Sequence, residues 1–323
     1  MIISKSSINS ERFRLPIRTE RVSKNTGLGL FGGLGLGLIF VAAGTCFILV
    51  GQKMILINPS RVYAPYWVIS VFGGIFAMGG LIVWTKLLKE QLMIRRCRNY
   101  DARHPYATAL KDYPWDPKGM MKSPWSRVGK SLFATLFLAV FLAPFNWWAW
   151  SYHESELMIK IIVSVFDIIL VFVFIELVRR VLVALKYSKS GITYETFPAL
   201  TGSRIDIKWL PPSGIEDSTS ITFVLRCVEE WTESKGTVEH QRNRLIHEQL
   251  WAATQKMEGR IFCQHHNPIL LSFDIPDTVP ESNLANKRKI IFWELDVFTE
   301  AFGVDFQEYY LVPVYTQAAP SGV

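Results

Sequence analysis

Four long apolar runs constrain this chain more than any other feature of its sequence. They lie at Gly27–Val50, Tyr66–Thr85, Ser131–Trp150 and Ile159–Leu182. An α-helix rises about 1.5 Å per residue, so each run is long enough to cross a hydrocarbon core of about 30 Å. The first run also exceeds the apolar stretch of about 7–15 residues that is usual in a cleaved signal. The sequence therefore predicts a membrane α-helical protein with four spans in two hairpins.

The distribution of Lys and Arg around these runs predicts the orientation of the spans. There are 6 before the first run, 2 between the first and second, 11 in the loop after the second, none between the third and fourth, and 4 just after the fourth. Basic loops are retained on the cytoplasmic side of a membrane. We therefore expect both termini in the cytoplasm. The basic residues flank apolar runs instead of alternating with aromatic residues on a soluble face, so membrane lipids, and no nucleic acid, are expected partners.

Composition divides the chain into a membrane half and a soluble half. Residues 1–190 hold 24 Lys and Arg against 10 Asp and Glu, whereas residues 191–323 hold 11 against 18. The segment before the first span is polar and has little to bury, so we expect a mostly disordered arm. The expected parts are a disordered basic cytoplasmic arm at 1–26, a first transmembrane hairpin at 27–86, a basic cytoplasmic loop at 87–130, a second transmembrane hairpin at 131–188, a cytoplasmic β-sandwich at 191–316 and a tail at 317–323.

Small residues in the first two spans predict close helix packing. Gly29, Gly33 and Gly37 repeat every fourth residue, which places them on nearly one face of a helix. Gly73 and Ala77 offer a similar small surface on the second span. We expect spans one and two to pack closely through these residues, with homodimerisation as the alternative use of the glycines.

Two sets of side chains are expected to meet the membrane surface. Tryptophans prefer the interface between water and lipid, where they act as anchors. The expected anchors are Trp67, Trp84, Trp147, Trp148 and Trp150. Arg95, Arg96 and Arg98 follow the second span and either lie along anionic headgroups or serve only as a topology signal. Pro144, within the third run, is expected to kink or end that helix.

The fourth span carries ionisable residues, which are functional suspects inside a membrane. Lys160 lies near the interface, and Glu176 has Arg179 and Arg180 three and four residues later, so both have structural explanations. Asp167 lies near the middle of the span and has no such partner within its own helix. We expect an interhelical hydrogen bond at Asp167, with proton or ion conduction as the alternative.

The soluble half is patterned as short strands separated by turns. Ile291, Trp293, Leu295 and Val297 alternate with outward residues, and a second strand at Tyr310–Val314 closes the domain. Trp293 and Leu295 are expected to be core residues. The remaining expected strands are Ile192–Glu195, Arg204–Trp209, Ser220–Glu229, about Glu248–Thr254 and Ile269–Phe273. Such spacing predicts an antiparallel β-sandwich, with Gly236–Met257 left open as a hairpin or a short helix.

No catalytic or metal-binding pattern is found in the soluble half. His247-Glu248 lacks the second histidine of a zinc protease because Trp251 occupies that position. His265 and His266 are adjacent and have no third ligand in view. The four cysteines, Cys46, Cys97, Cys227 and Cys263, show no paired spacing. We therefore expect no enzyme activity, no cofactor and no metal.

Several ordered motifs carry a resemblance to a known family. They are Ile221–Cys227, Ile269–Pro276 with Pro280 and Ser282, Ile291–Leu295, Gly303–Asp305, Val312–Val314, Tyr113-Pro-Trp115-Asp-Pro and Asn146-Trp147. From about residue 110 onward the chain resembles a family of uncharacterised bacterial membrane proteins in which a carboxy-terminal, arrestin-like β-sandwich follows transmembrane hairpins. The resemblance implies the inner membrane of a bacterium and a fold suited to binding proteins or peptides, and it implies no catalytic residue.

These observations favour a non-enzymatic membrane protein that anchors a cytoplasmic sandwich for binding another protein, as a scaffold or as an accessory subunit. Binding by strand addition at an exposed sheet edge is one expected mode. The loops Gly236–Glu239 and Gln264–Asn267 are the other places where we expect a binding site. Two alternatives stay open. One is a transporter or channel accessory component that uses Asp167, and the other is a membrane-interface enzyme that uses His247, His265 or His266.

Overall fold

The computed structural model of the chain describes most of its residues. The described residues are 3–9, 13–15, 30–55, 65–98, 107–151, 157–215, 220–235, 242–258, 267–285, 289–300 and 305–316. They form two compact units. The helical unit comprises Asn25–Ile94 and Trp125–Leu182, and the β unit comprises Met1–Lys24, Arg95–Pro124 and Val183–Val323.

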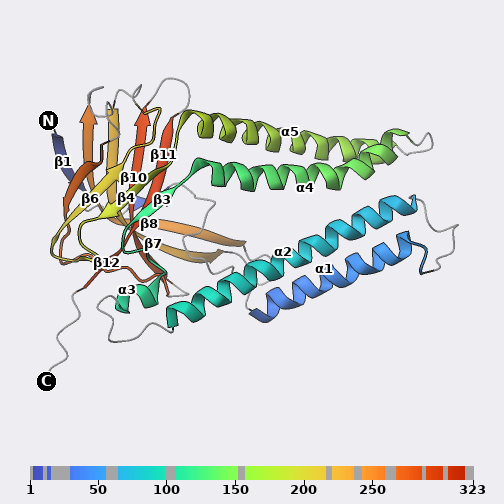
Figure 1. The fold of residues 1–323 in the computed structure, drawn as a ribbon, viewed down its shortest axis with the longest axis horizontal. Helices are drawn as coiled ribbons and strands as arrows, with labels where there is room; N and C mark the ends of the chain where they lie inside the picture. Colours follow the sequence, from blue (N-terminus) through green and yellow to red (C-terminus); the bar gives the residue numbers. More distant parts are fainter. Residues whose placement is uncertain are drawn as a thin grey trace. The chain divides into compact units, whose positions relative to one another are not determined.

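The helical unit is built from two helical hairpins (Figure 1). Its helices are α1 (Leu30–Gly51), α2 (Tyr66–Arg98), α4 (Pro124–Ser151) and α5 (Leu157–Lys186). Within the described residues, these four helices are long and apolar enough to cross a membrane. The large apolar side chains of α5 are exposed along most of its length, which is the surface expected where lipid is the solvent.

Three helix ends differ from the expected spans. Helix α2 continues past Thr85 to Arg98, so the basic segment after the second span is helical. Helix α4 begins at Pro124, because proline suits the first turn of a helix, where no N–H is needed. It also continues through Pro144 to Ser151, so this proline does not end the helix, which was one of its two expected effects. In apolar surroundings the other backbone groups have no partner outside the helix, so they keep their helical bonds.

Helices α1 and α2 approach backbone to backbone at small residues. A Cβ atom added to Gly44 would lie 2.5 Å from both the N of Ala77 and the O of Gly73. A Cβ added to Gly73 would lie 2.5 Å from the O of Gly44. The two helices therefore need glycine at these positions, and their contact centres on Gly44, which was absent from the expected set.

The amino-terminal half of α1 packs under two large side chains of α2. A Cβ at Gly33 would collide with Leu87, and one at Gly37 would collide with Trp84. The indole N–H of Trp84 donates to the O of Leu34 at 3.3 Å. Trp84 was expected as an interface anchor, and its indole ring also packs against α1. Gly29 lies outside the described residues.

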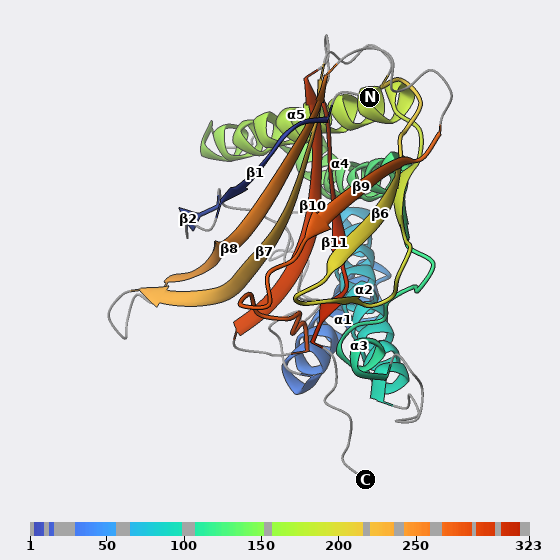
Figure 2. The same cartoon turned by 90° about the vertical axis from the view of Figure 1, so that its left-hand side faces the viewer.

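The β unit contains two antiparallel sheets and one short parallel pair (Figure 2). Sheet A has the order β1 (Ile3–Asn9), β8 (Arg242–Glu258), β7 (Ser220–Lys235), β10 (Lys289–Glu300) and β11 (Phe306–Val312), and β2 (Phe13–Arg14) also pairs with β8. Sheet B has the order β3 (Met120–Lys122), β4 (Ser190–Tyr194), β6 (Arg204–Leu210) and β9 (Ile269–Asp274). Strand β5 (Ala199–Leu200) pairs with β12 (Val314–Tyr315).

The two sheets share one apolar core, which makes the β unit a sandwich. From β10, Trp293, Leu295 and Val297 point into this core and are fully buried, which confirms the prediction for Trp293 and Leu295. From the opposite sheet, the ring of Trp209 meets Phe223 of β7 with centroids 5.1 Å apart. The period-two alternation of each strand supplies one apolar face, and burying these faces against each other holds the sheets together.

A second apolar cluster covers part of the outer face of sheet A. Helix α3 (Ala107–Asp112) and Trp115 pack there against Val228 and Phe292. The indole N–H of Trp115 donates to the hydroxyl of Tyr315 at 2.9 Å, and that hydroxyl donates to Asp112 at 2.8 Å. Residues 87–130 were expected to be a basic loop. Instead, α3 and β3 of this segment belong to the β unit, because apolar residues of α3 pack on sheet A and β3 pairs with β4.

The prediction of a mostly disordered amino-terminal arm, made from composition alone, was also wrong. Residues 3–9 and 13–14 form strands on the edge of β8 instead of a disordered segment. Composition predicts disorder from the lack of apolar side chains, but a strand on a sheet edge is held by backbone hydrogen bonds. Residues 1–2, 10–12 and 16–26 of this arm lie outside the described residues.

The last expected strand, Tyr310–Val314, is two strands in the structure. Strand β11 ends at Val312, and Pro313 separates it from β12, which leaves sheet A and pairs with β5. The open segment Gly236–Met257 is a strand from Arg242 onward. Gly303, expected in the connection before β11, lies outside the described residues.

The glycine packing of α1 and α2 predicts a difference between two alanine variants. Gly44→Ala places a Cβ against the backbone of α2, whereas Gly35→Ala points into open space. Overpacking costs about 1–3 kcal/mol, while alanine in an open helical position gains up to about 1 kcal/mol. We expect Gly44→Ala to lower the melting temperature of the detergent-solubilised chain and Gly35→Ala to leave it unchanged or raise it. Equal effects of the two changes would contradict the packing.

The hydrogen bonds of Tyr315 predict a stability change that depends on pH. Burial, and next the charge of Asp112, raise the pKa of Tyr315 above its usual value. Its neutral form therefore stabilises the fold below the unfolded pKa of about 10, and this contribution is lost as the pH rises further. We expect Tyr315→Phe to cost about 1–2 kcal/mol at pH 7 through the lost hydrogen bonds. We also expect a smaller fall in melting temperature between pH 9 and 11 than in the unchanged chain.

Candidate interaction site

The histidine motif of the soluble half is placed in a way that excludes metalloprotease geometry. His247 lies on β8 and is buried, and its Nε2 is 3.0 Å from Glu230 on β7. Glu248 is the next residue of the strand and points to the other face, while Trp251 is a core residue. Among the described residues, no group of three His, Cys, Asp or Glu side chains is placed to hold a metal. His265 and His266 lie outside the described residues.

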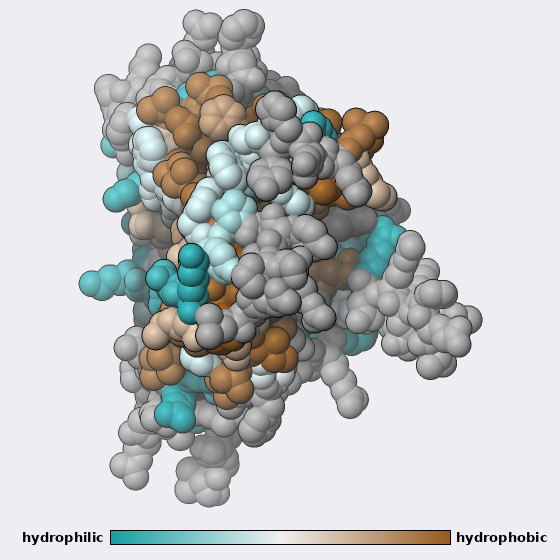
Figure 3. Space-filling view, turned by 90° about the vertical axis from the view of Figure 1, so that its right-hand side faces the viewer, coloured by the Kyte–Doolittle hydropathy of each residue, from teal (hydrophilic) through white to brown (hydrophobic). Residues whose placement is uncertain are grey.

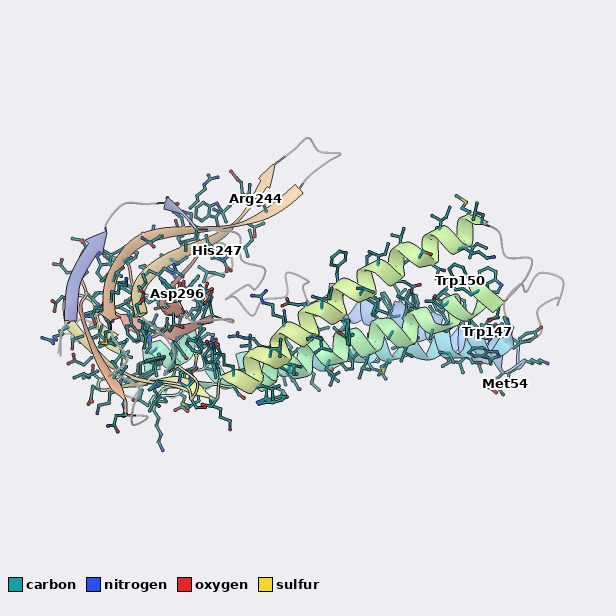
Figure 4. All side chains as sticks on the ribbon, turned by 90° about the horizontal axis from the view of Figure 1, so that it is seen from above. Met54, Trp147, Trp150, Arg244, His247 and Asp296 are labelled. Carbon is teal, nitrogen blue, oxygen red and sulfur yellow. The ribbon has the colours of Figure 1, made fainter. Side chains whose placement is uncertain are left out.

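A buried ionic cluster lies on the outer face of sheet A. The Nε of Arg226 is 2.6 Å from Glu294, and an Nη is 2.7 Å from Asp296. The guanidinium also lies over the ring of Tyr309, 5.7 Å from its centroid. Arg226 faces Glu294 directly across the β7–β10 pairing, so the cluster ties two central strands together. Figure 4 shows Asp296 and His247 on the sheet.

This ionic cluster was not predicted from the sequence. The only available signal was that Glu294 and Asp296 occupy the outward phase of an alternating strand. Buried charges need to be paired and hydrogen-bonded, and each carboxylate of this cluster accepts a hydrogen bond from Arg226. Its geometry is that of a structural clamp, because the two carboxylates are occupied by the arginine.

The two acidic residues of α5 are also paired. Asp167 of α5 accepts a hydrogen bond of 2.7 Å from the side-chain amide of Asn146 on α4, which is an interhelical bond of the expected kind. Glu176 lies 2.9 Å from Arg180 and 3.6 Å from Arg179. Asn146 therefore holds α4 and α5 in one register at the depth of Asp167.

The ends of the helices carry aromatic and basic side chains. Trp67 of α2 and Trp147 of α4 meet edge to face with centroids 5.4 Å apart, and Lys160 lies over the ring of Trp150. Figure 3 faces this end of the helices and shows apolar residues exposed there. Met54, labelled at this end in Figure 4, is among the exposed apolar side chains. Arg95 is exposed near the end of α2, while the side chains of Arg96 and Arg98 lie outside the described residues.

One edge of sheet A is closed by side chains from sheet B. Strand β11 directs the backbone groups of Tyr309 and Leu311 away from β10. The carbonyl of Tyr309 accepts a hydrogen bond from Lys122 of β3, and the carbonyl of Leu311 accepts one of 2.9 Å from the hydroxyl of Tyr194. Lys122 also lies 3.2 Å from Glu308. Two successive outward carbonyls of this edge are therefore occupied.

The edge of sheet B at β9 is partly closed by sheet A in the same way. Gln255 of β8 points across the sandwich, and its amide donates to the carbonyl of Ser272 at 2.5 Å. That carbonyl lies at the middle of the six-residue strand β9. Pro268 and Pro276 flank the strand, which further limits pairing because proline has no N–H. The opposite edge of sheet B is β3, which has only three residues.

The edge of β8 is covered by backbone instead of side chains. Strand β1 pairs antiparallel with β8 from Ala252 to Met257, and β2 pairs with Glu248 and Gln249. The backbone N–H of Leu15 continues this pairing by donating to the carbonyl of His247 at 2.9 Å, and residues 10–12, between the two segments, lie outside the described residues. The register of β1 also shifts between Ser4 and Ser7, so this strand contains a bulge.

Strands β7 and β8 extend beyond the rest of sheet A as a two-stranded arm, which we define as residues 232–235 and 242–245 (Figure 2). The pairing of β10 with β7 stops at Trp231, opposite Lys289. Within the described residues, no further strand pairs with the arm. Thr232 and Arg244 are exposed on it, and Figure 4 labels Arg244 there. The residues between the two strands, including Gly236–Glu239, lie outside the described residues, as do residues 264–266.

Comparison with known proteins gives little further information. No protein-family model and no curated protein matches the chain. Among solved structures, the chain is similar to the sporulation control protein Spo0M from Bacillus subtilis, with 12% identity and a TM-score of 0.24. The match covers 40% of this chain and 49% of Spo0M, so the chain spans about half the length of that protein.

The Asn146–Asp167 bond predicts different outcomes for two substitutions. Asp167→Asn preserves a polar partner for Asn146, whereas Asp167→Leu removes it. Interhelical hydrogen bonds in membranes contribute about 0.6–1.7 kcal/mol. We expect the leucine variant to melt at a lower temperature in detergent and the asparagine variant to melt near the unchanged chain. Adding Asn146→Leu to Asp167→Leu should cost less than the sum of both single changes, and strict additivity would contradict the pairing.

Proposed function

We propose that this protein is a membrane-anchored adaptor whose four helices hold a cytoplasmic sandwich that binds another protein. The observation that carries this proposal is the β7–β8 arm. A two-stranded ribbon is marginally stable in water, and its unpaired backbone groups invite pairing with another chain. Among the described residues, no third strand pairs with the arm beyond Trp231, where the β7–β10 pairing stops.

The charge distribution supports the compartment of this proposal. The loop after the second span holds 11 Lys and Arg, and the connection between the third and fourth spans holds none. By the positive-inside rule, this proposal places the sandwich and both termini in the cytoplasm, and the family resemblance favours the inner membrane of a bacterium. The arrestin-like resemblance adds a fold-level reason to expect protein binding.

The described polar groups support a binding role in preference to catalysis or transport. Arg226, Glu294 and Asp296 form a closed clamp on the sheet. In the spans, Asp167 is bonded to Asn146, which supports a structural role for this carboxyl. A reaction or a conduction pathway would need such groups to face a substrate or a water-filled path.

The proposal is tested by site-specific photo-crosslinking in living cells. A photoreactive amino acid is placed at Arg244 on the arm, and a matched control is placed at Arg204, an exposed residue of β6. We expect a discrete protein adduct from position 244 and none of that mass from position 204. A second chain, in which residues 232–245 are replaced by Asn-Gly, should lose the same protein in mild-detergent purification. Full retention of that protein would overturn the proposal.

A further inference from the structure

We propose that the β8 edge between Ala252 and Met257 is a strand-addition site for an extended segment of a partner protein, and that β1 occupies this site when the partner is absent. This inference rests on the proposed adaptor function and specifies where and how the partner binds. Strand addition supplies affinity through backbone hydrogen bonds and specificity through alternate side chains.

The other edges of the sandwich leave less room for a partner. On β11, the outward carbonyls of Tyr309 and Leu311 accept bonds from Lys122 and Tyr194. On β9, the central carbonyl of Ser272 accepts a bond from a side chain. Strand β3 has only three residues. The β8 edge is different, because its backbone groups are paired with a separate strand that can exchange for another strand of the same kind.

The register of β1 shows which sequence fits this edge. Ile3 lies opposite Met257, and Ile8 lies opposite Ala253, and both of these β8 residues belong to the sandwich core. Two residues five positions apart would fall on opposite sides of a regular strand. The bulge between Ser4 and Ser7 adds one residue, so both isoleucines are in register with core positions of β8.

Among the described residues, β1 and β2 pair with only part of β8, and a longer partner strand would pair with more of it. Strand β1 reaches only to Ala252, β2 pairs with two residues, and residues 242–245 of the arm have no neighbouring strand on this side among the described residues. A continuous partner strand, antiparallel to β8, keeps the bonds that β1 makes and adds bonds along the arm. Exchange therefore replaces the β1 hydrogen bonds near Met257 with equivalent ones and adds backbone hydrogen bonds toward Arg242.

These observations define the chemistry of the partner segment. It is an extended stretch with aliphatic residues opposite Met257 and Ala253 and with polar residues opposite Lys256 and Thr254. The β1 sequence, Ile-Ser-Lys-Ser-Ser-Ile-Asn, has this pattern. A synthetic peptide of residues 1–10 is thus a suitable probe, and a peptide with both isoleucines changed to serine is its control.

The test compares open and locked forms of the full chain in detergent. Ser7→Cys with Thr254→Cys, in a background without the four native cysteines, locks β1 onto β8, because these residues are cross-strand partners within disulfide reach. We expect the labelled peptide to bind a chain lacking residues 1–10 at least tenfold more tightly than it binds the oxidised, locked chain. Reduction of the locked chain should restore binding, and the serine control peptide should bind neither form.

Two results would overturn this inference. One is equal binding of the peptide to the oxidised and reduced forms of the same chain, a comparison in which folding is held constant. The other is an undiminished adduct from Arg244 in the locked chain, since the partner would then bind away from the β8 edge while the adaptor function stands. By contrast, the absence of any specific adduct from the arm in every form overturns the adaptor function itself, whatever the peptide does.

Discussion

Backbone hydrogen bonding at sheet edges is the constraint on which the β unit depends. An edge strand leaves every second N–H and C=O group without a ladder partner, and each such group needs water, a side chain or another strand. Here Lys122 and Tyr194 supply side chains to β11, and Gln255 supplies one to β9. Of these three edges, and within the part of the chain that the structure describes, β8 is the one covered by another strand. This difference distinguishes the edges bonded by side chains from the β8 edge, at which we propose strand exchange.

The need for hydrogen-bond partners also applies to the helical unit, whose long apolar helices suit lipid as a solvent. Lipid offers polar groups no hydrogen-bond partner, and two features of this unit suit such a solvent: α4 continues through Pro144, and Asp167 is bonded to Asn146. Apolar side chains gain nothing from leaving lipid for a helix contact, so the α1–α2 contact relies on close approach at Gly44 and Gly73. Both units are therefore organised around satisfying backbone and polar groups, with apolar burial joining the two sheets.

The sequence predicted those parts of the fold that depend on side-chain pattern. Four apolar runs gave four long helices, and alternation in β10 identified Trp293 and Leu295 as core residues. Features that depend on backbone pairing were missed, because Ile3–Asn9 and Met120–Lys122 have no pattern that marks them as strands. The ionic cluster around Arg226 was missed for a related reason, as were the side-chain hydrogen bonds to the edge strands β11 and β9. They join residues far apart in the chain, and their pairing is visible only once the register of the strands is known.

Hydrogen–deuterium exchange of the full chain in detergent most directly tests whether β1 detaches from the β8 edge. We predict that amides of Ala252–Met257 facing β1 exchange much faster than amides in the β7–β10 pairing, because β1 leaves β8 without unfolding the sandwich. Adding the peptide of residues 1–10 to a chain that lacks them should protect these same amides. Slow exchange at the β8 edge, equal to that of the central strands and unchanged by removal of β1, would contradict the account.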